Sequence, residues 1–317
     1  MGGQAFFLGR CDAPVLLQRL HAAGVHVLPL ESVPARFDDL QETLAVAARV
    51  KPDWIVLDGY RFEPDYQETL HRLPGARLLV VDDMAHWPTY HADVILNQNL
   101  GAADLRYFAP GQSRLLMGTQ YALLRREFMS WPKRKRVFSE AASKLLITLG
   151  GSGSLVKTSK MMEALDDVEV DDLEARIVVW SGLSAEALTT PRSRKWLRVM
   201  GEVSNMPELM AWADVAVIAG GSTCLEATFM GLPSLVTVLG DNQWANAEGM
   251  AKGGVAVNLG RLVEASPTQI AQALKALLCD AEARRSMSAQ GQLLVDGRGV
   301  DRVLEALRSY SPASVSQ

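Results

Sequence analysis

Short apolar runs alternate with longer amphipathic segments along most of this chain. Runs this short, when turn residues bound them, are typical of buried parallel strands, and the segments between them predict helices. The predicted strands span 4–8, 25–30, 54–57, 78–81, 94–96, 145–149, 175–180, 197–200, 215–219 and 234–239. The main predicted helices span 12–23, 36–49, 206–212, 267–279, 281–291 and 298–309. This alternation predicts an α/β fold with two doubly wound, Rossmann-like domains.

The composition changes around residues 129–143, where SWPKRKRVFSEAAS is polar, basic and interrupted by Pro132. Such a stretch is typical of an interdomain linker. The basic run at 133–136 is short, which favours solvated linker charges over a nucleic-acid patch. The expected boundaries are an N-terminal α/β domain at 1–130, a linker at 131–143, a C-terminal α/β domain at 144–300, and a helix and tail at 301–317.

The stretch 215–243 has the pattern strand, glycine turn, helix, strand. Gly220 and Gly221 end the first apolar run, and Ser222 and Thr223 stand where a helix N-cap is expected. The free N–H groups of a helix N-terminus attract anions, phosphate above all. Glu226 follows one helical turn after Ser222 and is expected to face the same ligand. The pattern predicts a nucleotide diphosphate site.

A second glycine-rich turn, GGSGS at 150–154, also follows a predicted strand and precedes a predicted helix. It has neither the Gly-Lys-Ser/Thr of a P-loop nor the GxGxxG fingerprint. A turn of this kind is as often structural as it is phosphate-binding when it stands alone. Two such turns in one domain favour the diphosphate site.

The polar residues near these turns have structural as well as ligand-binding interpretations. Glu226 lies between Leu225 and Ala227 in an otherwise apolar helix, where an unpaired carboxylate is costly. A bidentate contact with ribose hydroxyls is therefore favoured over a solvated position. Asn242 and Gln243 follow the next strand, where a simple turn and a ligand contact both fit.

Polar residues also follow the predicted strands of the N-terminal half, at the sheet edge where open α/β proteins bind ligands. Asp82 and Asp83 fit a metal site, an acid/base pair, or a capping role. No histidine or further carboxylate lies at a convincing ligand spacing, so we expect no metal. His86 and His91 flank Asp83, and surface or capping roles are favoured for them over catalysis.

Length, charge and cysteine content exclude several classes of protein. The 317 residues are enough for two domains, and a net charge of −4 disfavours a nucleic-acid partner. No apolar run approaches the roughly 20 residues of a membrane span, and the first residues do not resemble a signal peptide. Cys11, Cys224 and Cys279 are scattered, which excludes a disulfide framework and is typical of a cytoplasmic protein.

The chain resembles the pseudaminic-acid pathway hydrolases and the related spore-coat polysaccharide proteins over about residues 5–307. The segments that carry the resemblance are WIVLDGY (54–60), VDDMAHWPTYHADVILNQN (81–99), GTQYALLRREF (118–128), LITLGGSGS (146–154), VSNMPELMAWADVAVIAGGSTCLEA (203–227) and DNQ (241–243). The resemblance implies a GT-B fold, with two Rossmann-like domains and a cleft between them. It also implies cleavage of UDP-2,4-diacetamido-2,4,6-trideoxy-β-L-altropyranose without a cofactor.

The resemblance further implies where the substrate binds. It places UDP on the C-terminal domain, with the uracil against the backbone near Val203 and Met206 and the ribose on Glu226. The positions implied to contact the diphosphate or the sugar from this domain are Gly151, Ser152, Gly221, Ser222, Thr223, Asn242 and Gln243. The positions implied to cover the sugar from the N-terminal domain are Asp58, Tyr60, Asp83, Asn97 and Tyr121.

One feature of the family is absent. Its members begin with a strand and a Gly-x-Gly-His-x-x-Arg loop, whose histidine acts on the attacking water. This chain begins MGGQAFFLGRCDAP and contains no Gly-His pair. We therefore expect the first βα unit of the N-terminal domain to be missing, and no catalytic residue is assigned. A general base contributes about 10²–10⁴-fold, so we expect the chain to bind a UDP-sugar better than it hydrolyses it.

The leading prediction is a UDP-sugar hydrolase of surface-glycan biosynthesis, such as flagellin glycosylation. We expect it to be a cytoplasmic monomer without a nucleic-acid or membrane partner. One alternative is a GT-B glycosyltransferase that uses a UDP-sugar donor, and the other is a non-catalytic UDP-sugar-binding homologue.

Overall fold

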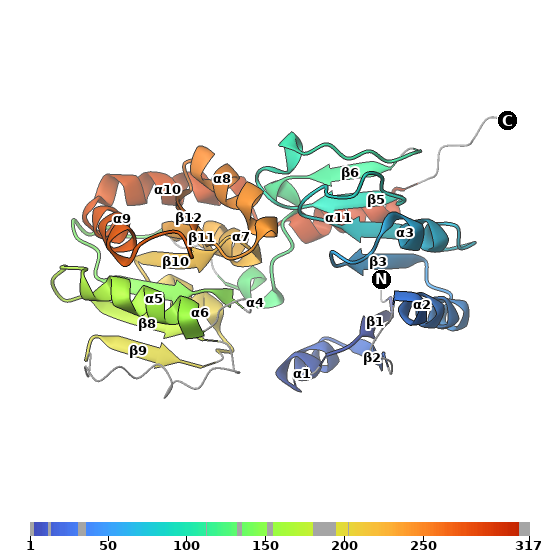
Figure 1. The fold of residues 1–317 in the computed structure, drawn as a ribbon, viewed down its shortest axis with the longest axis horizontal. Coiled ribbons are helices and arrows are strands. Elements are labelled where there is room, and N and C mark those ends of the chain that lie inside the picture. Colours follow the sequence, from blue (N-terminus) through green and yellow to red (C-terminus); the bar gives the residue numbers. More distant parts are fainter. Residues whose placement is uncertain are drawn as a thin grey trace. The chain divides into compact units, whose positions relative to one another are not determined.

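The computed structural model describes residues 3–11, 14–30, 36–111, 113–131, 135–150, 155–179, 195–201 and 203–310. The chain divides into two compact units (Figure 1). The first comprises Met1–Val80, Trp87–Asp93 and Ala109–Ser113, and the second comprises Val81–His86, Val94–Phe108 and Arg114–Gln317.

The first unit begins with two parallel strands, β1 (Ala5–Gly9) and β2 (Val25–Pro29), which helix α1 (Pro14–Ala22) connects. Its further elements are α2 (Arg36–Val50), β3 (Trp54–Asp58), α3 (Pro64–His71) and most of β4 (Arg77–Val81). Leu57, Leu70 and Leu79 are among its buried side chains. The strands predicted at 4–8, 25–30, 54–57 and 78–81 are confirmed to within one residue at each end.

The second unit contains two sets of parallel strands. In the smaller set, β5 (Val94–Asn97) pairs with β6 (Arg114–Met117). The larger sheet consists of β7 (Lys144–Thr148), β8 (Glu174–Val178), β9 (Leu197–Met200), β10 (Val215–Ala219), β11 (Ser234–Val238) and β12 (Ala256–Arg261). Its strands are parallel and lie in the order β12-β11-β10-β7-β8-β9. This is the doubly wound order, in which the direction of winding reverses between β7 and β10.

The helices of the second unit lie between its strands and, for the last three, after β12 (Figure 1). They are α4 (Arg126–Met129), α5 (Leu155–Asp166), α6 (Met206–Trp212), α7 (Ser222–Phe229), α8 (Trp244–Lys252), α9 (Pro267–Cys279), α10 (Ala281–Leu294) and α11 (Gly299–Arg308). The helices predicted at 206–212 and 267–279 are confirmed at both ends. The sequence pattern did not predict β12, because this strand lies at the sheet edge and its polar residues Asn258 and Arg261 interrupt the apolar run.

Strand β10 shows why helices cover both faces of this sheet. All of its residues are buried. Val215 and Val217 belong to a core cluster that includes residues of α5 and α9. Ala216 and Ile218 belong to a second cluster, with residues of α6, α7 and α8. Because successive side chains of a strand point to opposite faces, a strand buried on both faces must be apolar throughout, as the run at 215–219 is.

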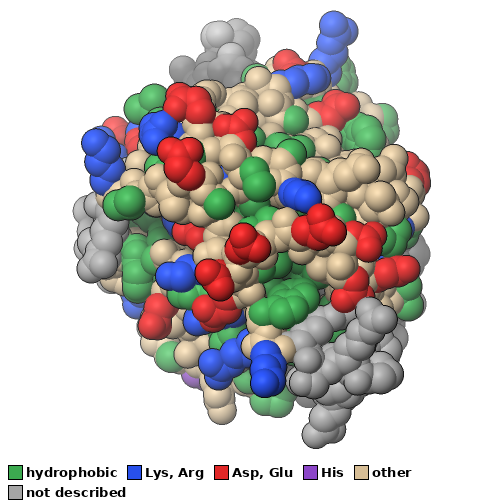
Figure 2. Space-filling view, turned by 90° about the vertical axis from the view of Figure 1, so that its left-hand side faces the viewer, with side chains coloured by type: hydrophobic (Ala, Val, Ile, Leu, Met, Phe, Trp, Pro, Cys, Tyr) green, Lys and Arg blue, Asp and Glu red, His purple; other side chains and the backbone are tan. Residues whose placement is uncertain are grey.

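The surface carries charges of both signs. On the face shown in Figure 2, Asp and Glu side chains are interspersed with Lys, Arg and apolar side chains. This mixing gives no extended single-sign field over that face. Within the described residues, no helix is long and apolar enough to cross a membrane.

Arg136 corrects one expectation about the basic run at 133–136. Its guanidinium donates to the carbonyl oxygens of Ala213 at 2.6 Å and Met230 at 3.1 Å, and also to that of Met210. These carbonyls lie at the C-terminal ends of α6 and α7, which favour a cation. Burial lowers the pKa of Arg136 to about 10, and the charge of Asp214 opposes that fall. Arg136 is therefore not a solvated linker charge, whereas the linker boundaries stay a prediction.

A second arginine, Arg284, forms hydrogen bonds with the part of the chain that follows this basic run. It lies on α10 and is only 1% exposed. Its guanidinium donates to the Leu277 carbonyl oxygen at 2.7 Å, to that of Leu278, and to that of Ser139. One buried side chain thus joins the end of α9, the start of α10 and the segment that leads into β7.

We expect Arg284→Met to lower the free energy of unfolding by about 2–4 kcal/mol, because it leaves buried carbonyl groups without a donor. Urea denaturation measures this change. Arg285→Met is the matched control, since the Arg285 side chain is 56% exposed and its ion pair with Glu282 lies at the surface. Its effect should stay within about 0.5 kcal/mol, and equal losses in the two variants would contradict the role of Arg284.

Candidate functional site

The point where the winding reverses brings two glycine-rich turns together. β7 and β10 are adjacent, with Thr148 paired to Ile218 near their C-terminal ends. The turn after β7 begins at Gly150, which has a φ of +61° that favours glycine. The predicted site residues Gly151 and Ser152 lie outside the described residues. In doubly wound proteins, ligands bind at this edge of the sheet, outside the carboxyl ends of the strands.

The turn after β10 leads directly into α7. Gly221 is the N-cap, and no side chain caps the helix. Ser222, which the sequence placed at the N-cap, is the first helical residue and is exposed, and Thr223 is half-buried. The first N–H groups of a helix have no partner within it, and its dipole favours negative charge there. This end of α7 is therefore suited to bind an anion.

The two glycines of this turn differ in the space around them. A Cβ on Gly220 would lie 3.0 Å from the carbonyl oxygen of Gln243 and 3.1 Å from its Cβ. A Cβ on Gly221 would meet only the Gln243 Nε2, at 3.8 Å. Gly220 thus permits a close backbone approach, whereas the space beside Gly221 is open.

The Gln243 side chain stabilises the loop that follows β11 through a hydrogen bond to the backbone. It is 7% exposed, and its Oε1 accepts a hydrogen bond from the Leu239 N–H at 2.9 Å. Its Nε2 lies near Gly221, so the structure brings these two predicted site residues together. Asn242 precedes it in the same short 3₁₀ turn and is half-buried.

Asn246 fixes the turn from the side of α8, and the sequence did not single it out. It is 1% exposed. Its Nδ2 donates to the Gly220 carbonyl oxygen at 2.9 Å, and its Oδ1 accepts from the Leu100 N–H at 3.3 Å. One amide thus connects the glycine turn after β10 to the loop after β5. No local pattern marks an asparagine for such a role, because its partners are distant in the sequence.

Glu226 lies on α7 and is 4% exposed. Its carboxylate is paired with Arg125, whose Nε donates to Oε1 at 2.6 Å and whose Nη2 donates to Oε2 at 2.9 Å. Burial raises the pKa of Glu226, and the hydrogen bonds and charge of Arg125 oppose the rise. Burial also disfavours the charged form of Arg125, but the hydrogen bonds and charge of Glu226 outweigh it and raise the Arg125 pKa. The sequence missed Arg125, although the segment 118–128 contains it.

A polar network lies at the ends of β4 and β5. Asp82 accepts hydrogen bonds from the Met84 and Ala85 N–H groups and from the Tyr107 hydroxyl, at 2.9, 2.7 and 2.8 Å. Asn97 is fully buried, and its Nδ2 donates to the same hydroxyl at 2.8 Å. The Asn97 Oδ1 in turn accepts from the backbone N–H two residues along. Asp82 thus holds the turn that follows β4, and it does not cap a helix, because the next element among the described residues is β5.

Of the other predicted site residues, Asp83 adjoins this network through Asn99. Asp83 accepts a hydrogen bond from the Asn99 Nδ2 at 2.7 Å. Met206 begins α6 and is mostly buried, at 8% exposed, and Val203 precedes it, half-buried. Tyr121 ends a 3₁₀ turn after β6. Asp58 and Tyr60 lie in the first unit, at the end of β3, and both are exposed.

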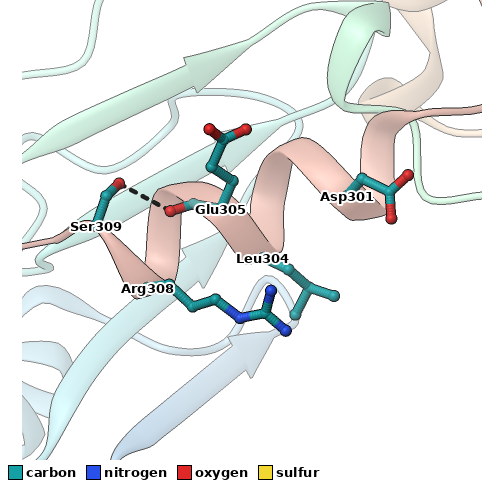
Figure 3. Close-up of a pocket in the computed structure, with 5 residues that line it drawn as sticks. All are labelled: Asp301, Leu304, Glu305, Arg308 and Ser309. Carbon is teal, nitrogen blue, oxygen red and sulfur yellow. Dashed lines mark hydrogen bonds between the residues drawn. The ribbon is translucent and has the colours of Figure 1, made fainter. Parts of the chain in front are cut away.

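A hollow of about 550 Å³ lies along α11 (Figure 3). Its lining residues are Asp301, Leu304, Glu305, Arg308 and Ser309. Glu305 and Arg308 extend from opposite sides of the helix (Figure 3). No predicted site residue lines it, and no cluster of three or more metal-ligating side chains occurs among the residues that the structure describes.

Comparisons with known proteins agree with this geometry. Residues 141–298, which contain both glycine turns, match the Glycosyltransferase family 28 C-terminal domain. The spore coat polysaccharide biosynthesis protein SpsG of Bacillus subtilis (strain 168) is 26% identical over 237 residues, which cover 74% of this chain and 69% of that protein. Residues 141–298 are therefore similar to a glycosyltransferase C-terminal domain, and 74% of the chain is similar to SpsG. The expected similarity to a spore-coat polysaccharide protein is confirmed.

Solved glycosyltransferases share the fold of this GT-B chain. The glycotransferase of kitacinnamycin superposes with a TM-score of 0.66 at 16% identity, covering 96% of this chain and 92% of that one. UGT89C1 of Arabidopsis thaliana, solved with UDP, gives 0.67 at 12% identity, covering 96% and 93%. The predicted α/β fold of GT-B type is therefore confirmed.

We expect Asn246→Asp to destabilise the protein by about 1–3 kcal/mol at pH 8, because a carboxylate cannot donate to the Gly220 carbonyl. Burial raises the folded-state pKa of the new carboxyl above its unfolded value. The variant should therefore approach wild-type stability as the pH falls and the carboxyl becomes a donor, and lose it as the pH rises. Urea denaturation of both proteins at several pH values measures this, and a pH-independent difference would contradict it.

Proposed function

We propose that this chain binds a UDP-sugar, with the diphosphate at the N-terminus of α7. The observation that carries the proposal is the open, uncapped turn at Gly221, at the point where the winding of the sheet reverses. Phosphate groups accept hydrogen bonds from such N–H groups, and the helix dipole favours their charge. The similarity of this region to a nucleotide-sugar enzyme domain supports the same ligand class.

The remaining parts of the nucleotide follow from the same placement. Ser222 and Thr223 lie at the end of α7 that we assign to the phosphates, with the Gln243 Nε2 near the preceding Gly221 and Asn242 next to Gln243 in its turn. Glu226 is one helical turn further along, where we assign the ribose. The uracil is assigned to the backbone near Val203 and Met206, at the start of α6. UGT89C1, solved with UDP, supports UDP as the nucleotide.

The reaction we propose first is hydrolysis of UDP-2,4-diacetamido-2,4,6-trideoxy-β-L-altropyranose or a related UDP-sugar in polysaccharide biosynthesis. Water attacks the anomeric carbon, the bond from that carbon to the diphosphate oxygen breaks, and UDP leaves with the bonding electron pair. The N-terminus of α7 stabilises the charge on the departing diphosphate. The similarity to SpsG supports this assignment, and no residue is assigned as the general base.

Glycosyl transfer is the second candidate. The solved proteins that share the fold include glycosyltransferases. In this reaction an acceptor hydroxyl takes the place of water, and the UDP half of the site is unchanged. A protein that binds the UDP-sugar without turning it over would use the same UDP half of the site.

We expect Gly221→Ala to weaken UDP binding about tenfold, because the added methyl group occupies the space at the helix N-terminus that a phosphate would fill. The backbone φ of −89° at Gly221 accepts alanine, so thermal unfolding should not change. Calorimetry with UDP and with uridine measures the effect, which should be confined to UDP. Gly220→Ala provides the contrast, since its methyl group meets the Gln243 backbone and should lower stability as well. Equal UDP affinity in Gly221→Ala and wild type would remove the diphosphate assignment.

Turnover separates the candidate reactions. A hydrolase releases UDP and free sugar in equal amounts from the UDP-sugar alone, whereas a transferase releases UDP only when an acceptor is present. We expect slow release without acceptor, measured by chromatography of both products. Release that requires an acceptor would replace hydrolysis with transfer, and UDP binding without release under either condition would establish a binding protein.

A further inference from the structure

We propose that Arg125 is a positioning residue for nucleotide binding: it orients Glu226 so that the carboxylate accepts hydrogen bonds from the ribose hydroxyls. This inference deepens the UDP-sugar function proposed above and rests on it. Arg125 precedes residues 141–298 in the sequence, so it lies outside the region that matches the glycosyltransferase family 28 C-terminal domain.

The geometry of the pair defines the direction of the carboxylate. Two nitrogens of the Arg125 guanidinium donate to the two oxygens of Glu226, at 2.6 and 2.9 Å. A two-point contact of this kind fixes the plane of the carboxylate as well as its position. Each carboxylate oxygen accepts about two hydrogen bonds, so each keeps one acceptor site for another donor. Two neighbouring ribose hydroxyls supply such a pair of donors.

The charges around Glu226 favour hydroxyl groups over phosphate. Arg125 also pairs with Glu127, whose Oε1 lies 2.9 Å from the Arg125 Nη1. Among the described residues, the titratable groups that act on Glu226 or that it acts on are Arg125, Glu127 and Cys224. One cation therefore stands against two carboxylates, and the set is negative overall. An anion is disfavoured there, whereas a hydroxyl donor is favoured.

The spacing along α7 matches the two parts of the ligand. Ser222 and Glu226 are four residues apart in the helix, which corresponds to a rise of about 6 Å. The anion-binding end and the carboxylate are thus separated by about one helical turn. A nucleoside diphosphate has its charged groups and its ribose hydroxyls at a separation of this order.

Packing holds Arg125 in this position. Leu124 and Phe128, on either side of it in the chain, belong to the same core cluster as Leu225 and Ala227 of α7. The guanidinium carbon lies 5.2 Å from the centre of the Phe128 ring, within the range of a cation–π contact. The segment that carries Arg125 is therefore fixed against α7 before a ligand binds.

The test compares the affinities of UDP and 2′,3′-dideoxy-UDP by calorimetry. Wild type should bind UDP about tenfold or more tightly than the dideoxy compound. At low pH, Arg125→Gln should bring this ratio close to one, with the affinity for dideoxy-UDP changed less than about threefold. Arg126→Gln is the matched control, because Arg126 is the exposed neighbour, and it should keep the wild-type ratio.

A pH series distinguishes positioning from a structural role. Without Arg125, burial and the charge of Glu127 leave the Glu226 pKa raised, so the carboxyl of Arg125→Gln is protonated at low pH. Its UDP preference should return in part as the pH rises and Glu226 ionises. The wild-type ratio should fall only at a lower pH than that of Arg125→Gln, because Arg125 opposes the rise of the Glu226 pKa that burial causes. A loss of folding alone would change both ligands equally and at every pH.

The outcomes separate this inference from the function on which it rests. An unchanged ratio in Arg125→Gln overturns the role of Arg125 and leaves UDP binding standing. If wild type binds UDP and dideoxy-UDP equally, the assignment of the ribose to Glu226 is wrong, and the inference is overturned with it. If wild type does not bind UDP at all, both the proposed function and the inference are overturned. If Arg125→Gln does not fold, Arg125→Lys keeps the charge without the two-point contact, and a ratio between those of wild type and one supports the proposal. A wild-type ratio in Arg125→Lys would overturn it.

Discussion

Burial of β10 on both faces is the constraint on which the second unit depends. Two core clusters meet on this strand, so it must be apolar at every position and must lie inside the sheet. With β7 beside it, its end becomes the place where the winding reverses. The chain leaves that end at Gly220, where the backbone of Gln243 comes so close that a side chain would not fit without a shift. The fold and the position of the site therefore have one physical cause.

The polar groups around this turn fall into two kinds. Asn246 and Gln243 are buried, and their side chains hold backbone groups of the turn and the loop after β11. The N-terminal end of α7 has no side-chain cap, and Ser222 there is exposed. Internal hydrogen bonds fix the frame, and no side chain caps the helix end, where we propose that the diphosphate binds. A frame held in this way does not need to reorganise when an anion binds.

The charge along α7 changes sign between its first and second turns. Its first turn has the positive end of the helix dipole, and its second turn has Glu226, paired with Arg125. The buried carboxylate requires this partner, because an unpaired charge there would be costly. At the C-terminal ends of helices, Arg136 and Arg284 instead donate hydrogen bonds to carbonyl oxygens that have no other helical partner. Half-buried Arg125 thus pairs with a carboxylate, whereas half-buried Arg136 and buried Arg284 donate to helix C-termini in this unit.

The sequence by itself determined the fold class, the position of most strands and the glycine turn at Gly220, because periodicity and turn residues are local properties. It also indicated that Glu226 needs a partner, since a carboxylate in an apolar helix is costly. Only the tertiary structure decided that the partner is Arg125, which is 101 residues away. The same holds for Asn246, which contacts Leu100 from 146 residues away. Such pairs depend on which segments pack together, and no local pattern of residues records that.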